Sequence, residues 1–137
     1  MLAFVTAKNL RHIMTISQMF KYYNNNPMKQ KLPDCVCRAI SLALRMPYNY
    51  IMYKLRENGV CYDCDDLTVD CYINLIRDLG YESSDAGNLS VEELCNAYPD
   101  DILIIRISGH LTCAINGICH DIWDCGNEIA DLYWIIT

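Results

Sequence analysis

The periodicity of the apolar residues changes at Pro99, and this change constrains the fold more than any other feature of the sequence. Upstream of Pro99, apolar residues recur at helical spacing in several segments. Downstream, the nearly continuous apolar run from Ile102 to Ser108 is typical of a central strand, and Leu132 to Ile136 predicts a last strand. Helices followed by an antiparallel sheet make an α+β fold.

The expected helices are bounded by capping and breaking residues. We expect Asp34 to be the N-cap of the first helix, CVCRAISLALR. The later helices are expected from Pro47 to about Arg56 with Gly59 as its end, from about Leu67 to Leu79 with Gly80 as its end, and from Ser90, which forms a capping box with Glu93.

Asn116-Gly117 predicts a tight hairpin turn between HLTCAI and ICHDIW. A two-residue turn pairs Cys113 with His120 and sets His110 opposite Trp123. Side chains alternate between the faces of the hairpin. The face expected in the core carries Leu111, Cys113, Ile115, Ile118, His120 and Ile122. The other face carries His110, Thr112, Ala114, Cys119, Asp121 and Trp123.

The composition excludes several classes of protein. A formal charge of −6 argues against a nucleic-acid scaffold, because binding phosphates needs clustered Lys and Arg. No apolar run has the length of a membrane span, and the first residues lack the arrangement of a signal peptide. We therefore expect a cytoplasmic protein that binds neither nucleic acid nor membrane.

The nine cysteines are expected to be reduced in that compartment, and most of them to be small buried side chains. A disulfide framework is the alternative reading, which would suit a secreted chain. Cys61 and Cys64 have the spacing of zinc ligands, but no second pair with that spacing follows them. We therefore expect no metal and no other cofactor.

Cys35, His110 and Asp121 form the strongest candidate site. Cys35 would lie in the first turn of its helix, where free backbone N–H groups and the helix dipole favour a thiolate. His110 and Asp121 would share one face of the hairpin, where a carboxylate can orient a histidine and support its charged form. Asp124 would replace Asp121 if the register slipped by one residue. The structural alternatives are a buried cysteine and a simple His–Asp hydrogen bond.

Four short blocks of the sequence resemble a known family. These blocks are Asn26-Pro27, Asp34 to Ala39 (DCVCRA), Gly109 to Gly117 (GHLTCAING) and Asp121 to Cys125 (DIWDC). They resemble the papain-like cysteine peptidase superfamily, most closely small phage and bacterial proteins that are similar to the peptidase domains of bacteriocin-processing transporters. The resemblance implies a papain-like fold over residues 24–137, in which the helix that bears the nucleophile comes first and an antiparallel sheet follows. Residues 1–23 would be an N-terminal extension with a weak helical pattern, and the natural start could be Met14.

This resemblance implies a cysteine-nucleophile hydrolase or acyl-transfer enzyme acting on a protein or peptide. Cys35 would attack, His110 would act first as base and then as acid, and Asp121 would orient His110. The alternative is a catalytically inactive relative that binds a host protein, such as a phage accessory factor.

Five further residues are candidates for support of this site. The resembled peptidases use a Gln shortly before the cysteine for the oxyanion hole; Gln30 lies five residues before Cys35, and Asn26 is another candidate donor. Arg38 would pair with Asp34 or with Asp124, or would be a plain surface arginine. Trp123 would either shield the Cys–His pair from water or pack in the core.

Overall fold

The computed structural model describes residues 19–137. Within this range the chain forms four helices and a six-stranded mixed sheet with the strand order β1-β5-β4-β3-β6-β2. The elements in chain order are β1 (Phe20–Tyr22), α2 (Cys35–Leu44), α3 (Tyr48–Tyr62), α4 (Val69–Asp78), β2 (Ser84–Asp85), α5 (Val91–Ala97), β3 (Ile102–Ile107), β4 (His110–Ile115), β5 (Ile118–Asp121) and β6 (Ala130–Ile136). The expected α+β class is confirmed.

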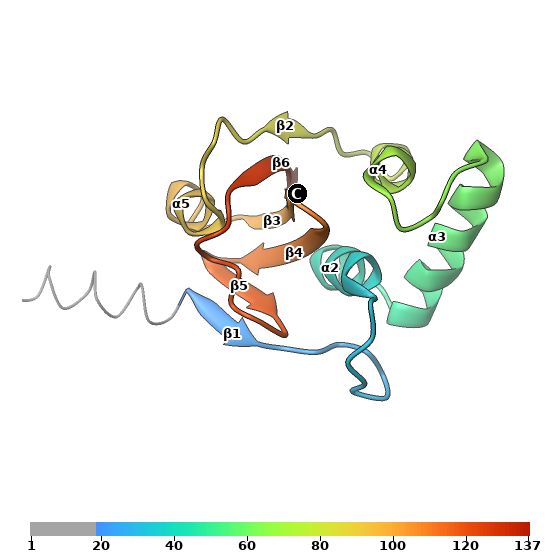
Figure 1. The fold of residues 1–137 in the computed structure, drawn as a ribbon, viewed down its shortest axis with the longest axis horizontal. Coiled ribbons are helices and arrows are strands. Elements are labelled where there is room, and N and C mark those ends of the chain that lie inside the picture. The colour runs from blue at the N-terminus through green and yellow to red at the C-terminus, as the bar shows by residue number, and fades with distance from the viewer. Residues whose placement is uncertain (1–18) are drawn as a thin grey trace, which may run out of the picture.

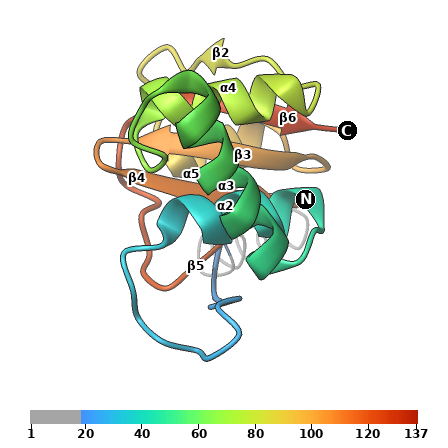
Figure 2. The same ribbon diagram turned by 90° about the vertical axis from the view of Figure 1, so that its right-hand side faces the viewer.

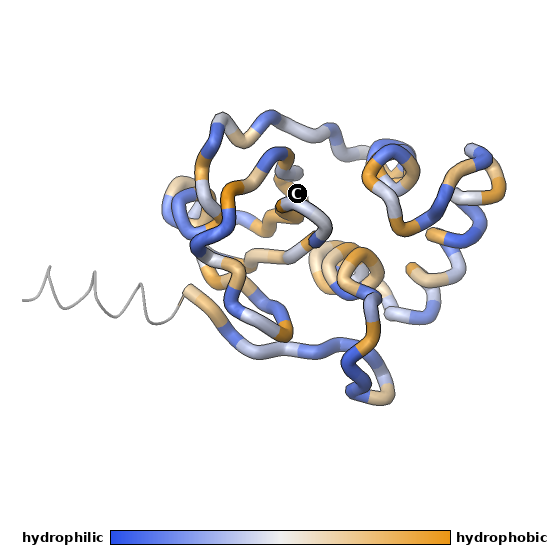
Figure 3. The backbone as a smooth tube through the Cα atoms, in the orientation of Figure 1, coloured by the Kyte–Doolittle hydropathy of each residue, from blue (hydrophilic) through white to orange (hydrophobic). Residues whose placement is uncertain are grey.

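Helices cover both faces of the sheet. Figure 1 shows α2, α3 and α4 on one side and α5 on the other. The strands β3, β4 and β6 send alternate side chains to each side, so that Ile104 packs with α2 and α4 while Leu103 packs with α5. Apolar colouring follows the central strands and α2 in Figure 3, whereas the connection between β1 and α2 is mostly hydrophilic.

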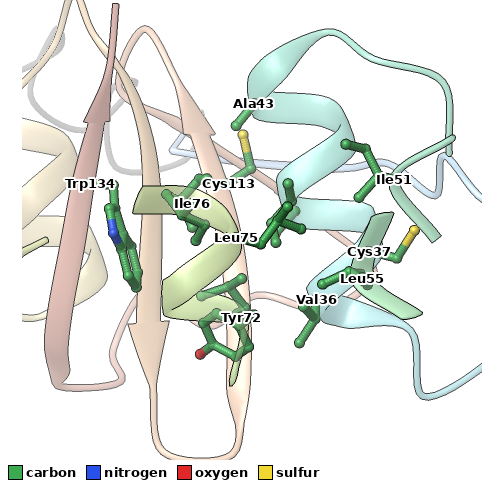
Figure 4. Close-up of a cluster of buried hydrophobic side chains, with 14 of the residues drawn as sticks. Val36, Cys37, Ala43, Ile51, Leu55, Tyr72, Leu75, Ile76, Cys113 and Trp134 are labelled. Atoms are coloured by element: carbon green, nitrogen blue, oxygen red, sulfur yellow. The ribbon is translucent and has the colours of Figure 1, made fainter. Parts of the chain in front are cut away.

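The larger core lies between the sheet and α2, α3 and α4. Figure 4 shows Trp134 of β6 facing Ile76 and Tyr72 of α4, with Cys113 of β4 close to α2. Burial of these side chains supplies the main driving force for packing the helices on the sheet.

The helix starting at Cys35 is confirmed, with Asp34 at the N-cap position, where its carbonyl oxygen accepts a hydrogen bond from the Arg38 N–H. The Asp34 side chain makes no capping hydrogen bond and instead accepts hydrogen bonds from Arg38 and Tyr48. The helix ends where Arg45 adopts a left-handed conformation with φ 56°.

The second helix is longer than predicted, because Gly59 does not end it. α3 continues to Tyr62 and ends at Asp63, which has a φ of 51°. Gly59 is buried within the helix, and the Cys64 carbonyl oxygen lies 3.0 Å from the position that a Cβ would take. The other two helices agree with expectation: α4 ends shortly before Gly80, and the Ser90–Glu93 capping box is present.

The hairpin has the predicted register. Asn116 and Gly117 both have positive φ, and Cys113 pairs with His120. The expectation that one face would form the core is incomplete, because Ala114 and Cys119 on the other face are also buried, under α5.

The sheet begins earlier in the chain than expected. β1 pairs in parallel with β5, which makes the sheet mixed rather than wholly antiparallel. Residues 20–22 therefore pair with the sheet although they precede the expected domain boundary at residue 24. The rest of the expected extension, including Met14, lies outside the described residues. None of the helices in residues 19–137 is long and apolar enough to cross a bilayer.

Candidate active site

Three elements bring the candidate residues to one end of the sheet. β4 begins at His110, β5 ends at Asp121, and α2 begins at Cys35. The hairpin turn fixes which residues of β4 and β5 face one another, and the packing of α2 against β4 adds the cysteine. The three residues expected to form the site are therefore brought together.

His110 and Asp121 make a direct hydrogen bond. The Nε2 atom of His110 donates to Oδ2 of Asp121 at 2.6 Å. Asp121 is only 1% exposed, and its Oδ1 accepts from the backbone N–H of Ile122 at 2.7 Å. Burial by itself would raise the pKa of the Asp121 carboxyl, but hydrogen bonds from His110, Thr112 and Ile122 outweigh burial and hold that pKa below its usual value. Asp121 is therefore a carboxylate.

The surroundings of Cys35 lower its pKa, and those of His110 raise its pKa. Burial would raise the pKa of the Cys35 thiol, but hydrogen bonds from His110 and from the backbone of Leu111 lower it overall. Burial would lower the pKa of His110, but its hydrogen bonds to Asp121 and Cys35 raise it to about 9. A thiol with a lowered pKa beside an imidazole with a raised pKa favours a thiolate–imidazolium pair.

Arg38 joins Asp121 to a second buried carboxylate. Its Nε donates to Oδ1 of Asp34 at 2.7 Å, and its Nη1 donates to Oδ1 of Asp121 at 3.0 Å. The Tyr48 hydroxyl also donates to Asp34, at 2.6 Å. Arg38 thus has its expected partner Asp34, but its second partner is Asp121 rather than Asp124. The role of Tyr48 was not predictable from the sequence, because no local pattern signals a contact that forms only when α3 folds against the start of α2.

The other two hairpin candidates have different surroundings. Trp123 is 41% exposed and its ring centroid lies 5.0 Å from that of His110, so it covers the imidazole and is not a core residue. Asp124 is exposed and accepts a hydrogen bond from the backbone of Gly126. Since Asp121 contacts His110 and Asp124 does not, the one-residue slip is wrong.

Neither candidate oxyanion donor reaches Cys35. The amide nitrogen of Asn26 is buried and donates to Asp34 at 3.1 Å and to Tyr48 at 3.3 Å. Gln30 is exposed, and neither residue lines the cavity at Cys35. The remaining donor at the site is the backbone N–H of Cys35, in the first turn of α2, where such groups have no partner within the helix.

A cavity of about 280 Å³ opens beside Cys35 and His110. Most of its lining side chains are apolar, and the lining residues come from α2, the segment before α4, α4 itself, β3, the β3–β4 turn and the start of β4. The residues that line it are Cys35, Val36, Leu67, Thr68, Val69, Tyr72, Arg106, Gly109, His110 and Leu111. The reactive pair therefore faces a space that could hold an apolar group.

One cluster of side chains at the site has the residue types of a metal-binding site. His110, Asp121 and Cys125 have ligand atoms within 4.8 Å of one another. Within this group His110 is hydrogen-bonded to Asp121, and the thiol of Cys125 shares a hydrogen bond with that of Cys119, with 3.8 Å between the two sulfur atoms. This hydrogen bond and burial raise the pKa of Cys125. The three groups are thus engaged in hydrogen bonds of their own.

The candidate zinc pair does not form. Cys64 is bonded to Cys71 in a disulfide, and Cys61 is a free, exposed thiol. The expectation of reduced cysteines is therefore wrong for Cys64 and Cys71, which are separated by 7 positions. That expectation came from the expected compartment, and spacing alone does not determine whether two thiols are oxidised. The buried free thiols Cys37, Cys95, Cys113, Cys119 and Cys125 pack as small side chains, as expected.

In comparisons with known proteins, no family model, no curated protein and no solved structure matches this chain.

Proposed function

We propose that this protein is a cysteine-nucleophile hydrolase or acyl-transfer enzyme with a papain-like arrangement, acting on a peptide or protein. The observation that carries this proposal is the 2.6 Å bond from His110 to the buried Asp121, next to a Cys35 thiol whose pKa is lowered. A buried cysteine that only packs would have its pKa raised, as the pKa of Cys113 is by burial. Cys35 differs in this respect from four buried cysteines whose pKa is raised, Cys37, Cys95, Cys113 and Cys125.

The reaction follows from these groups. The Cys35 thiolate attacks the carbonyl carbon of an amide or ester, and the C–S bond forms as the carbonyl oxygen becomes an oxyanion. The imidazolium of His110 then gives its proton to the leaving amine or alcohol, which departs and leaves a thioester on Cys35. Water, or another nucleophile in acyl transfer, attacks the thioester while His110 takes its proton. Asp121 holds the imidazole in place throughout.

A binding protein on the same fold is the second candidate. One observation favours it: the side-chain amides of Asn26 and Gln30 do not serve Cys35, so the oxyanion would have the Cys35 backbone N–H as its donor. Loss of one oxyanion donor costs about 10²–10³-fold in turnover. A protein of this kind would keep a reactive Cys35 without efficient turnover.

Reaction with an activated ester distinguishes the enzyme from the binding protein. We expect p-nitrophenyl hexanoate to acylate Cys35, with repeated release of p-nitrophenolate, and we expect Cys35→Ala to abolish that release. His110→Gln should lower turnover by about 10²–10⁴-fold, the usual contribution of a general acid–base. Cys61→Ala is the matched control, because Cys61 is a free thiol that is exposed and away from the site.

Peptide mass mapping would identify the acylated residue. Release that continues unchanged in Cys35→Ala would contradict the enzyme proposal. A single acylation of Cys35 without turnover would favour the binding protein.

A further inference from the structure

One wall of the Cys35 cavity belongs to a segment closed by a disulfide. Leu67, Thr68 and Val69 line the cavity and lie between Cys64 and Cys71, which are bonded to each other. Figure 2 shows the α3–α4 connection on the same side of the molecule as the β3–β4 turn and the start of α2, which supply the other walls. We call residues 64–71 the disulfide segment.

The disulfide segment makes hydrogen bonds within itself and to α3. Its internal bonds run from the Thr68 backbone and hydroxyl to the Asp65 carbonyl, at 3.0 and 2.8 Å. At its ends, the Cys64 N–H donates to the Gly59 carbonyl at 3.0 Å, and the Asn58 amide donates to the Cys71 carbonyl at 2.8 Å.

In the described part of the chain, no hydrogen bond joins residues 65–69 to α2 or to the sheet. Val69 is the first residue of α4 and packs against the larger core, so that helix fixes its position. The position of Leu67 relative to Cys35 depends on the two ends of the segment, which the disulfide ties together. Leu67 is 44% exposed, so little packing would hold it in place once the ends separate.

We propose that the Cys64–Cys71 disulfide is a redox-dependent clamp on the substrate-binding wall. With the disulfide formed, Leu67 lies against the cavity next to Val69, and both bind an apolar group of the substrate. Reduction releases Leu67 and weakens substrate binding, while the Cys35–His110–Asp121 arrangement stays unchanged, because none of its hydrogen bonds involves the disulfide segment. This proposal rests on the proposed function of Cys35 as the nucleophile.

The redox step is a thiol–disulfide exchange with a dithiol. Cys64 is half-buried and Cys71 is fully buried, so the thiolate of the dithiol attacks Cys64 Sγ. The S–S bond breaks and Cys71 leaves as a thiolate, which takes up a proton. The second thiol of the reductant then displaces Cys64, and the reductant becomes a disulfide. Two electrons and two protons pass to the protein.

Two electrophiles of different size test the clamp. Iodoacetamide needs only the Cys35 thiolate, whereas N-acetyl-leucyl chloromethyl ketone also needs the apolar wall; each forms a C–S bond and releases halide. In Cys64→Ser, we expect labelling of Cys35 by the chloromethyl ketone to slow by about tenfold, the order of effect of losing one apolar contact in a pocket. Labelling by iodoacetamide should stay within twofold of wild type, and Cys61→Ser should match wild type with both reagents.

The wild-type protein gives the same comparison without a mutation. After reduction by dithiothreitol and its removal, the chloromethyl ketone rate should fall and the iodoacetamide rate should not, with peptide mass mapping restricted to Cys35. Equal loss with both reagents, or no loss with either, would overturn the clamp and leave the nucleophile assignment intact. Failure of iodoacetamide to prefer Cys35 in wild type would overturn both proposals.

Discussion

Arg38 is the cation that pairs with two buried carboxylates, those of Asp34 and Asp121. Arg38, Asp34 and Asp121 are all at least nine-tenths buried, and the guanidinium bonds both carboxylates. Asp121 in turn holds His110. Burying a charge is costly unless it is paired, so the position of His110 depends on a cation on the neighbouring helix.

Replacing Arg38 should therefore destabilise the protein strongly. We expect Arg38→Met to lower the free energy of unfolding by about 3–5 kcal/mol, because it leaves two buried carboxylates without their cation. Urea unfolding would measure the loss. Lys54→Met is the matched control: Lys54 forms an ion pair with Glu57 on the surface of α3, and its removal should cause no measurable change. Equal effects of the two substitutions would contradict this account of Arg38.

At the scale of the elements, α3 and the disulfide segment fit together at Gly59. A Cβ on Gly59 would lie 3.0 Å from the Cys64 carbonyl oxygen and 3.1 Å from the Asp66 Cβ. This close approach explains why a glycine lies inside a helix, where sequence analysis expected it to end the helix. Helix propensity is a weak constraint, and here the tertiary contact decides the boundary.

Gly59→Ala tests this contact. Alanine gains about 1 kcal/mol of helix propensity over glycine. The clash with a backbone that a disulfide restrains should cost more, about 1–3 kcal/mol, so we expect a lower melting temperature. Val60→Ala, at an 82% exposed position next in the helix, should leave the melting temperature nearly unchanged. A Gly59→Ala protein more stable than wild type would show that the segment can move away from α3.

At the scale of the whole molecule, a local turn motif predicted the part of the site formed by His110 and Asp121. The Asn116-Gly117 turn sets the register of β4 and β5, and that register places His110 beside Asp121. The helix start at Cys35 was also predictable, because the apolar stripe and the break before it are local.

Contacts that form only in the folded chain were not predictable from local patterns. The parallel pairing of β1 with β5, the Tyr48–Asp34 hydrogen bond and the Cys64–Cys71 disulfide each join segments that carry no pairing signal of their own. For the same reason, the sequence did not reveal that the side chains of Asn26 and Gln30 lie away from Cys35. The Asn26 amide is used by Asp34 and Tyr48, which only the folded chain brings near it.

The pH dependence of Cys35 alkylation by iodoacetamide tests the central claim most directly, since only the thiolate reacts. The imidazolium of His110 lowers the pKa of Cys35, so the wild-type rate should reach half its maximum below pH 9.0, the usual value for a thiol. In Asp121→Asn, His110 loses the hydrogen-bonded carboxylate that helps to raise its pKa to about 9, and the Cys35 profile should move to higher pH. Asp124→Asn removes an exposed carboxylate away from His110 and should leave the profile unchanged. A wild-type midpoint at or above pH 9.0, or a profile that Asp124→Asn shifts and Asp121→Asn does not, would contradict the account.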